Sequence, residues 1–334
     1  MIQKNKKHKL TIKDVLSFFI PIVIAIILLI PVPYYITVGG GTIGIDEKIK
    51  VNNSYDSKGS FNCAYVSQTK GTIATYLLSK VIKNFELERI DDVTLTNEDV
   101  KDYDFREELY FKNSLNNALF VAYNKASKKI SVKDNKLYVL YVFEDADTSL
   151  ETRDVILKVD DMDVSSVEEI NVIIGKKNVG DKLNILVDRS GQKINTITKI
   201  IDIDGEKKIG VLVMNDISYE TDPYVSFDFS GREAGSSGGL MIALSIYNKL
   251  IDEDITKGLK IVGTGTIDSS GVVGEIGGVK YKLQGAVKKH ADVFLIPYEN
   301  YDEALKEVKD NNYKIKLIKV SSFDEALEKL KNIN

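Results

Sequence analysis

The feature that most limits the possible folds is a long uncharged segment near the start of the chain. No Asp, Glu, Lys or Arg occurs between Asp14 and Asp46, and residues 15–36 are almost continuously apolar. A helix that rises about 1.5 Å per residue would cross a hydrocarbon core of about 30 Å over such a length. The segment is preceded by Lys4, Lys6, Lys7, Lys9 and Lys13. The positive-inside rule therefore predicts a basic cytoplasmic tail over residues 1–14 and a transmembrane anchor over residues 15–36.

This anchor would make the protein a single-pass protein of the cell membrane, with everything after residue 36 outside the cell. The main alternative is a cleaved signal peptide, because the first residues are basic. No small-x-small cleavage site follows a short apolar core, which favours the anchor. Pro21 and Pro31 would bend or end the helix, but isolated prolines are tolerated in membrane spans. Tyr34 and Tyr35 fall where aromatic rings prefer the membrane interface.

Charge and rare residues exclude several classes of function. The net charge of −4 and the isoelectric point near 5.5 provide no basic surface for nucleic acid. Cys63 is the single cysteine, so it permits neither an internal disulfide nor a thiolate zinc cluster. We expect it to be a small packed side chain in a strand. The two histidines, His8 and His290, do not suffice for a histidine-based metal site. No metal, cofactor or nucleic-acid partner is expected.

The remainder of the chain divides into three regions that differ in their patterns of apolar residues and turns. Residues 37–126 begin with a glycine run and then show a strand near 60–66 and helical patterns near 72–85 and 102–126. Residues 127–202 change to short strands and turns. Residues 203–334 alternate helix and strand patterns, which is typical of an α/β fold. The expected helices there are 240–250, 279–290, 301–308 and 323–331, and the expected strands are 259–266, 292–297 and 314–319.

The middle region, 127–202, resembles a PDZ domain of the bacterial type, which is mainly β. Residues 153–159 (RDVILKV) are similar to the family's Gly-Asp-x-Ile-hydrophobic segment, and residues 179–181 and 188–191 match its later turns. The resemblance implies that an extended peptide is captured by strand addition. The peptide-binding strand would contain Leu137, Tyr138 and Val139.

Two positions depart from the PDZ pattern. Arg153 stands where the family has glycine, and Asn135-Lys136 replaces the glycine of the carboxylate-binding loop. A working peptide groove and a purely structural or docking module therefore both remain open.

Two glycine-rich turns in the last region contain the candidate catalytic residues. Residues 235–239 read Gly-Ser-Ser-Gly-Gly and open an amphipathic helix, whose N-terminal N–H groups suit a developing oxyanion. Alone, this turn is also compatible with a flexible loop and an N-cap serine. Residues 277–282 read Gly-Gly-Val-Lys-Tyr-Lys and open a second helix. A lysine can serve as base to a serine when burial keeps it neutral.

Together these turns resemble the proteolytic domain of Lon peptidases over about residues 205–334. The matching motifs are Gly-x-Ser-x-Gly-Leu, Thr-Gly-Thr-Ile and Val-Gly-x-Ile-Gly-Gly-x-x-x-Lys, in that order. The layout of anchor, amino-terminal region, PDZ-like domain and Lon-type domain is similar to a membrane-anchored, ATPase-lacking branch, the YlbL-like proteins of Gram-positive bacteria. The resemblance implies an α/β Lon-type proteolytic domain plus a mainly β PDZ-like domain, preceded by one transmembrane helix.

The family motifs also assign the site residues. The nucleophile falls on Ser237, because Ser236 occupies the position where the family usually has proline. The base falls on Lys282 rather than Lys280, because three residues separate the family's lysine from its Gly-Gly pair. Two further residues are expected to support the site or the oxyanion, Thr264 and Gly238, the latter replacing the family's usual alanine.

The implied function is a membrane-anchored, ATP-independent extracellular serine endopeptidase that works through an acyl-enzyme. Its partners would be peptides or exposed protein segments and the membrane, and the sequence is compatible with a homo-oligomer. A catalytically inactive anchored peptide-binding or scaffold module is the alternative. A Ser-His pair would have to use His290, which a surface position near a helix end makes a poor candidate. Part of residues 37–126 could complete the protease sheet, and the PDZ-like domain would then be an insertion.

Overall fold

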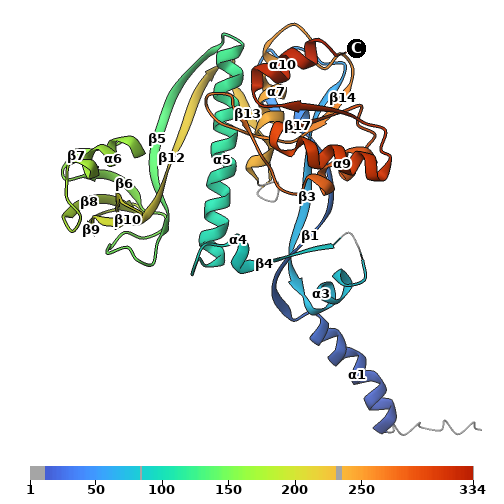
Figure 1. Ribbon diagram of the computed structural model, residues 1–334, viewed down its shortest axis with the longest axis horizontal. Coiled ribbons are helices and arrows are strands. Elements are labelled where there is room, and N and C mark those ends of the chain that lie inside the picture. Colours follow the sequence, from blue (N-terminus) through green and yellow to red (C-terminus); the bar gives the residue numbers. More distant parts are fainter. Residues whose placement is uncertain (1–11, 83–84, 231–234, 334) are drawn as a thin grey trace, which may run out of the picture. The chain divides into compact units, whose positions relative to one another are not determined.

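The computed structural model describes residues 12–82, 85–230 and 235–333 and divides into two compact units (Figure 1). The first unit contains residues up to 39 and residues 67–93, and the second contains residues 40–66 and 94–334. Strands β1 (Pro31–Gly44) and β3 (Ser60–Thr72) contribute to both units. His8 and the lysines at positions 4, 6, 7 and 9 lie outside the described residues.

The first unit is built from helix α1 (Ile12–Leu28), the start of β1, α3 (Ile73–Ser79), β4 (Phe85–Arg89) and α4 (Ile90–Val93). The start of β1 pairs with β4 in antiparallel fashion. Thr72 caps α3, since its side chain accepts a hydrogen bond from the Thr75 N–H. The helix predicted over 72–85 ends at Ser79 and is thus shorter than expected, and a strand begins at Phe85.

The predicted anchor is helical only in its first part. Helix α1 ends at Leu28, and strand β1 begins at Pro31, whose ring fixes φ and lacks an N–H for a helix. The large apolar side chains of α1 are exposed, among them Phe18 and Phe19. Within the described ranges, no helix has both the length and the apolar character needed to cross a membrane. The transmembrane helix predicted over residues 15–36 is thus not supported.

The second unit contains a parallel sheet in the order β18-β17-β14-β3. Strand β14 (Lys260–Gly263) pairs with β3 on one side and with β17 (Val293–Pro297) on the other, and β17 pairs with β18 (Lys316–Val320). In the chain, β3 precedes the PDZ-like segment and the other three strands follow it. The sheet is therefore built from residues on both sides of that segment in the sequence.

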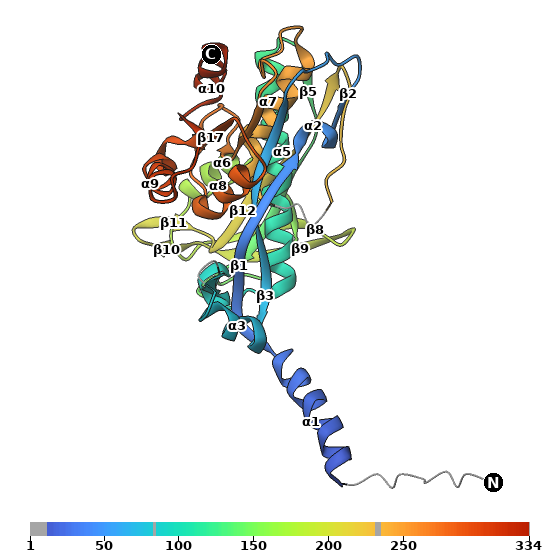
Figure 2. The same ribbon diagram turned by 90° about the vertical axis from the view of Figure 1, so that its right-hand side faces the viewer.

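Helices cover both faces of this sheet. Successive side chains of a strand point to opposite faces, and those of β17 are buried throughout. Ile261 belongs to the apolar core shared with α5 (Val100–Lys125), α7 (Gly239–Leu250) and α10 (Phe323–Lys331). Its neighbour Val262 belongs to the opposite core, shared with α8 (Val279–Lys288) and α9 (Tyr301–Asn311) (Figure 2). The α/β class predicted for the last region is confirmed, and the Ser322 side chain caps α10.

The PDZ-like segment has its own antiparallel sheet and its own apolar core. The sheet order is β12-β5-β6-β8-β9, and β7 pairs with β6. The core includes Ile209 and packs against Val211 and Val213, so the segment continues past residue 202. Its elements are β5 (Lys129–Val142), β6 (Val155–Val159), β7 (Met162–Asp163), α6 (Val167–Gly175), β8 (Lys182–Arg189), β9 (Gln192–Lys199) and β12 (Val211–Asp222).

Short elements complete the second unit. They are α2 (Ile45–Lys48), β2 (Ile49–Val51) with its partner β13 (Val225–Phe227), the hairpin β10 (Ile201–Ile203) and β11 (Glu206–Lys208), and the pair β15 (Thr266–Ile267) and β16 (Val273–Gly274).

The predicted peptide-binding strand of the PDZ-like segment is wrong. Leu137 and Tyr138 of β5 pair with β12 on one side and with β6 on the other. Val139 lies opposite Val213 of β12, and its N–H donates to the carbonyl of Asp154. A strand that is paired on both sides offers no free N–H and C=O groups to an incoming peptide. Strand β12 lies at the edge of the sheet beyond β5 and also contacts α6.

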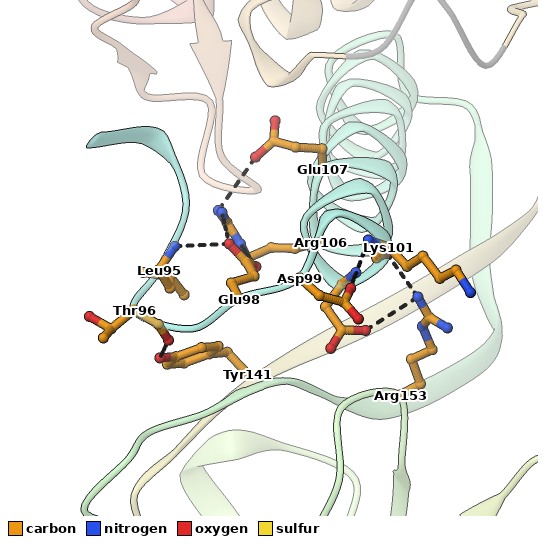
Figure 3. Close-up of polar contacts among 10 residues, drawn as sticks. Leu95, Thr96, Glu98, Asp99, Lys101, Arg106, Glu107, Tyr141 and Arg153 are labelled. Carbon is orange, nitrogen blue, oxygen red and sulfur yellow. Dashed lines mark hydrogen bonds and ion pairs between the residues drawn. The ribbon is translucent and has the colours of Figure 1, made fainter. Parts of the chain in front are cut away.

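Polar contacts join the PDZ-like segment to the first turn of α5 and to the residues just before it (Figure 3). The Arg153 guanidinium lies 3.3 Å from the Asp102 carboxylate and donates to the carbonyl of Lys101 at 2.8 Å. The Tyr141 hydroxyl donates to the carbonyl of Thr96. Arg153 has a φ of +76°, a conformation that favours glycine, which explains the family's preference at this position. Arg153, which departs from the PDZ pattern, thus provides a contact with α5.

We predict that Gly263→Ala destabilises the sheet of the second unit. A Cβ at this position would lie 2.5 Å from the Met241 sulfur and 2.8 Å from the Leu295 Cβ. Overpacking of this kind costs about 1–3 kcal/mol of unfolding free energy. Gly175→Ala is the matched control, because a Cβ there meets nothing within 4 Å. Calorimetry of the full chain should show a lower melting temperature for Gly263→Ala alone. Equal melting temperatures for both variants would contradict the close approach of Gly263 to Met241 and Leu295.

Candidate active site

The predicted nucleophile, Ser237, lies in a tight turn that leads into α7 of the second unit. Residues Ser236–Gly238 form one turn of 3-10 helix, and α7 begins directly after it. The carbonyl of Ser237 accepts hydrogen bonds from the Thr264 hydroxyl at 3.0 Å and from the Gly265 N–H at 2.7 Å. Because Thr264 and Gly265 follow the end of β14, the central sheet fixes the backbone of the turn.

The structure brings Ser237, Lys282 and Thr264 together. The Lys282 Nζ lies 2.9 Å from the Ser237 Oγ and 3.2 Å from the Thr264 Oγ1. Lys282 is in the first turn of α8, which starts after Gly278, a residue with a left-handed φ of +69°. The Nζ of Lys280, by contrast, lies over the ring of Tyr281, 5.4 Å from its centroid. The geometry therefore places Lys282, rather than Lys280, beside the serine.

The environment of Lys282 changes its acidity. The residue is only 4% exposed, and burial lowers its pKa to about 8. Desolvation disfavours the charged amine, so a substantial fraction is neutral at mildly alkaline pH. Burial also raises the pKa of the nearby Cys63 thiol to about 11. The thiol therefore stays protonated, and Cys63 is a packed side chain rather than a nucleophile.

Gly238 lies where the turn meets strand β3. A Cβ on this residue would be 3.2 Å from the Cys63 sulfur. The absence of a side chain at residue 238 thus accommodates Cys63 in the neighbouring strand. Gly238 is buried, and its peptide group is at the start of α7, where helix N–H groups favour negative charge.

A small, mainly apolar pocket adjoins Ser237. Phe111 of α5 and Phe229, which follows β13, meet edge to face with centroids 5.5 Å apart. Sequence reasoning did not find these residues, because no local motif connects segments so far apart in the chain. Such a pocket suits an apolar side chain of a bound peptide. Its lining includes Ile45, Cys63, Phe111, Phe229 and Ile242.

The remaining candidates lie elsewhere. His290 is exposed just past the C-terminus of α8 and has a φ of +56°, whereas the hydrogen bond to the Ser237 hydroxyl comes from Lys282. Leu137 and Val139 are buried in the core of the PDZ-like segment. Among residues 12–82, 85–230 and 235–333, no group of three or more His, Cys, Asp or Glu side chains is arranged to hold a metal ion.

Solved PDZ domains resemble part of the chain. The PDZ domain of the SdrC-like protein of Listeria innocua is 30% identical, covers 23% of this chain and 92% of that structure, and has a TM-score of 0.22. The corresponding domain from Listeria monocytogenes is 26% identical, covers 25% of this chain and 92% of that structure, and has a TM-score of 0.23.

The last region matches a family of proteases. Residues 231–332 match the family described as the Lon protease (S16) C-terminal proteolytic domain. A Lon protease of Helicobacter pylori is 30% identical over 126 residues, 38% of this chain and 15% of that protein. A Lon protease of Campylobacter jejuni is 29% identical over 177 residues, 50% of this chain and 22% of that protein. The chain thus spans less than a quarter of either relative's length. These similarities support a serine-type peptidase with a Lon-type proteolytic domain.

Proposed function

We propose that the protein is a serine endopeptidase that uses Ser237 as nucleophile and Lys282 as base. The observation that carries this proposal is the 2.9 Å contact between the Lys282 Nζ and the Ser237 Oγ at a buried site. A serine hydroxyl becomes a strong nucleophile when a neighbouring base accepts its proton, and a neutral lysine can do so. Thr264 helps to orient the amine, because its hydroxyl lies 3.2 Å from the Nζ.

The reaction would follow the acyl-transfer logic of other serine peptidases. The Ser237 Oγ attacks the substrate carbonyl carbon while Lys282 takes the hydroxyl proton. The N–H groups of Ser237 and Gly238 hold the oxyanion of the tetrahedral intermediate. Lys282 then gives the proton to the leaving amine, the peptide C–N bond breaks, and an acyl-enzyme remains. A water molecule, deprotonated by Lys282, hydrolyses this ester and restores Ser237.

We further propose that this activity is ATP-independent and lies outside the cell, near the membrane. The support is the uncharged apolar segment over residues 15–36 with lysines before it, and the exposed apolar side chains of α1. The printed sequence contains no Gly-x-x-x-x-Gly-Lys-Ser/Thr motif for a nucleotide. Substrates would therefore be loose peptides or exposed segments of proteins.

In this proposal the PDZ-like segment presents such segments along β12. Residues 211–215 form the start of this outer strand, and β12 contacts α6. Within the described residues, the ladder of β12 has β5 as its partner strand, so its other edge suits an extended peptide.

We predict that Ser237→Ala and Lys282→Met each lower cleavage of dye-quenched casein by the full chain at least about 10³-fold, because each removes one member of the reacting pair. Methionine retains most of the lysine's length and apolar contacts, so Lys282→Met should remain folded. Lys280→Ala is the matched control and should cleave like the wild type. Equal activity of Ser237→Ala and the wild type would rule out Ser237 as the nucleophile.

We predict that kcat/KM rises with pH through about 8 and then levels off. The sign follows from the chemistry, because only the neutral amine accepts the serine proton and deprotonation of Lys282 increases as pH rises. Lys282→Arg should be inactive throughout, since arginine stays protonated. Steady-state kinetics between pH 6 and 10 would check this; a profile that falls through pH 8 would rule out a neutral lysine base.

A further inference from the structure

The carbonyl before the nucleophile is held by a side chain from another part of the chain. Ser114 lies on α5, and its hydroxyl donates to the carbonyl oxygen of Ser236 at 3.0 Å. Ser114 is 4% exposed, so water does not compete freely for this contact. Serines inside helices commonly bond a carbonyl of their own preceding turn. The acceptor of Ser114 is instead 122 positions away, in the catalytic turn.

The approach of α5 to this turn is close enough to require glycine. A Cβ on Gly239 would lie 2.6 Å from the Ser114 Oγ and 2.8 Å from the Ile267 Cγ2. One turn further along α5, the Asn117 side-chain amide donates to the carbonyl of Ile267 at 3.2 Å. Helix α5 therefore contacts both the catalytic turn and the strand beside it.

Peptide geometry connects this contact to the reaction. In a planar trans peptide, the C=O and N–H groups point in opposite directions. The Ser236 carbonyl, which also accepts a hydrogen bond from the Gly239 N–H, belongs to one such group with the Ser237 N–H. The bond from Ser114 therefore helps to fix the direction of the Ser237 N–H. The next carbonyl, that of Ser237, is held by Thr264 and Gly265, which fixes the Gly238 N–H in the same way.

We propose that Ser114 is a positioning residue of the peptidase, which aims the Ser237 N–H at the substrate oxyanion by holding the carbonyl of Ser236. This inference rests on the proposed function, because it assigns Ser114 a part in the reaction of Ser237. Ser114 lies outside residues 231–332 and before the PDZ-like segment in the chain. The site is thus completed by a helix that the matched Lon-type region does not contain.

The test is the kinetics of Ser114→Ala in the full chain with dye-quenched casein. We expect kcat to fall about tenfold with KM nearly unchanged, because a misdirected donor weakens the transition state more than the bound substrate. The pH midpoint should stay at the wild-type value, since Lys282 is untouched. Binding of a peptide aldehyde, whose adduct carries the same oxyanion, should weaken by a similar factor. Asn124→Ala is the matched control, because its side chain bonds the carbonyl of Phe120 within α5.

The outcomes separate the two proposals. A wild-type kcat in Ser114→Ala, with Ser237→Ala inactive, would overturn the positioning role alone. A loss of kcat that comes with a similar rise in KM and a lower melting temperature would make Ser114 a structural residue, which also overturns it. If Ser237→Ala cleaves casein as well as the wild type, the peptidase proposal fails and the role of Ser114 fails with it.

Discussion

The buried contact between Lys282 and Ser237 is the constraint on which the rest of the second unit depends. A charged amine is costly to bury, and this cost is what lowers the pKa of Lys282 to about 8. The fold must therefore hold the amine in place against hydration. Helix α8 carries the lysine, α7 begins at the serine turn, and the end of β14 fixes that turn through Thr264 and Gly265. Small displacements of any of these elements would separate the two reacting atoms.

Helix α5 has contacts at both ends of the second unit. Its first turn bonds Arg153 of the PDZ-like segment (Figure 3), and Ser114 and Asn117 further along bond the catalytic turn and β15. The charge pair of Arg106 with Glu98 is almost fully buried beside this first turn, so the start of the helix is firmly held. One continuous helix therefore contacts both the PDZ-like segment and the turn of Ser237.

The PDZ-like segment shows how the order of elements can be predicted while the peptide-binding strand is assigned wrongly. The pattern of strands, helix and turns over 127–202 indicated the architecture, and the structure has that order of elements. The choice of the peptide-binding strand, however, depended on which strand lies at the edge of the sheet. Strand β12 begins at Val211, beyond the predicted boundary, and covers the edge of β5. The sequence sign of this strand was Gly210, a residue typical of turns, followed by the apolar run Val-Leu-Val-Met.

The sequence by itself determined the elements with strong local patterns. The helices at 102–126, 240–250 and 279–290 followed from apolar periodicity, and the resemblance to Lon motifs implied the proposed pair, Ser237 and Lys282. Local patterns failed at residues 31–36, where an apolar run forms strand rather than helix, because both states bury the same residue types. Only the tertiary structure decided the roles of Ser114, Phe111 and the β12 edge. These depend on contacts between residues 69 to 122 positions apart in the chain, and no pattern within one segment specifies such contacts.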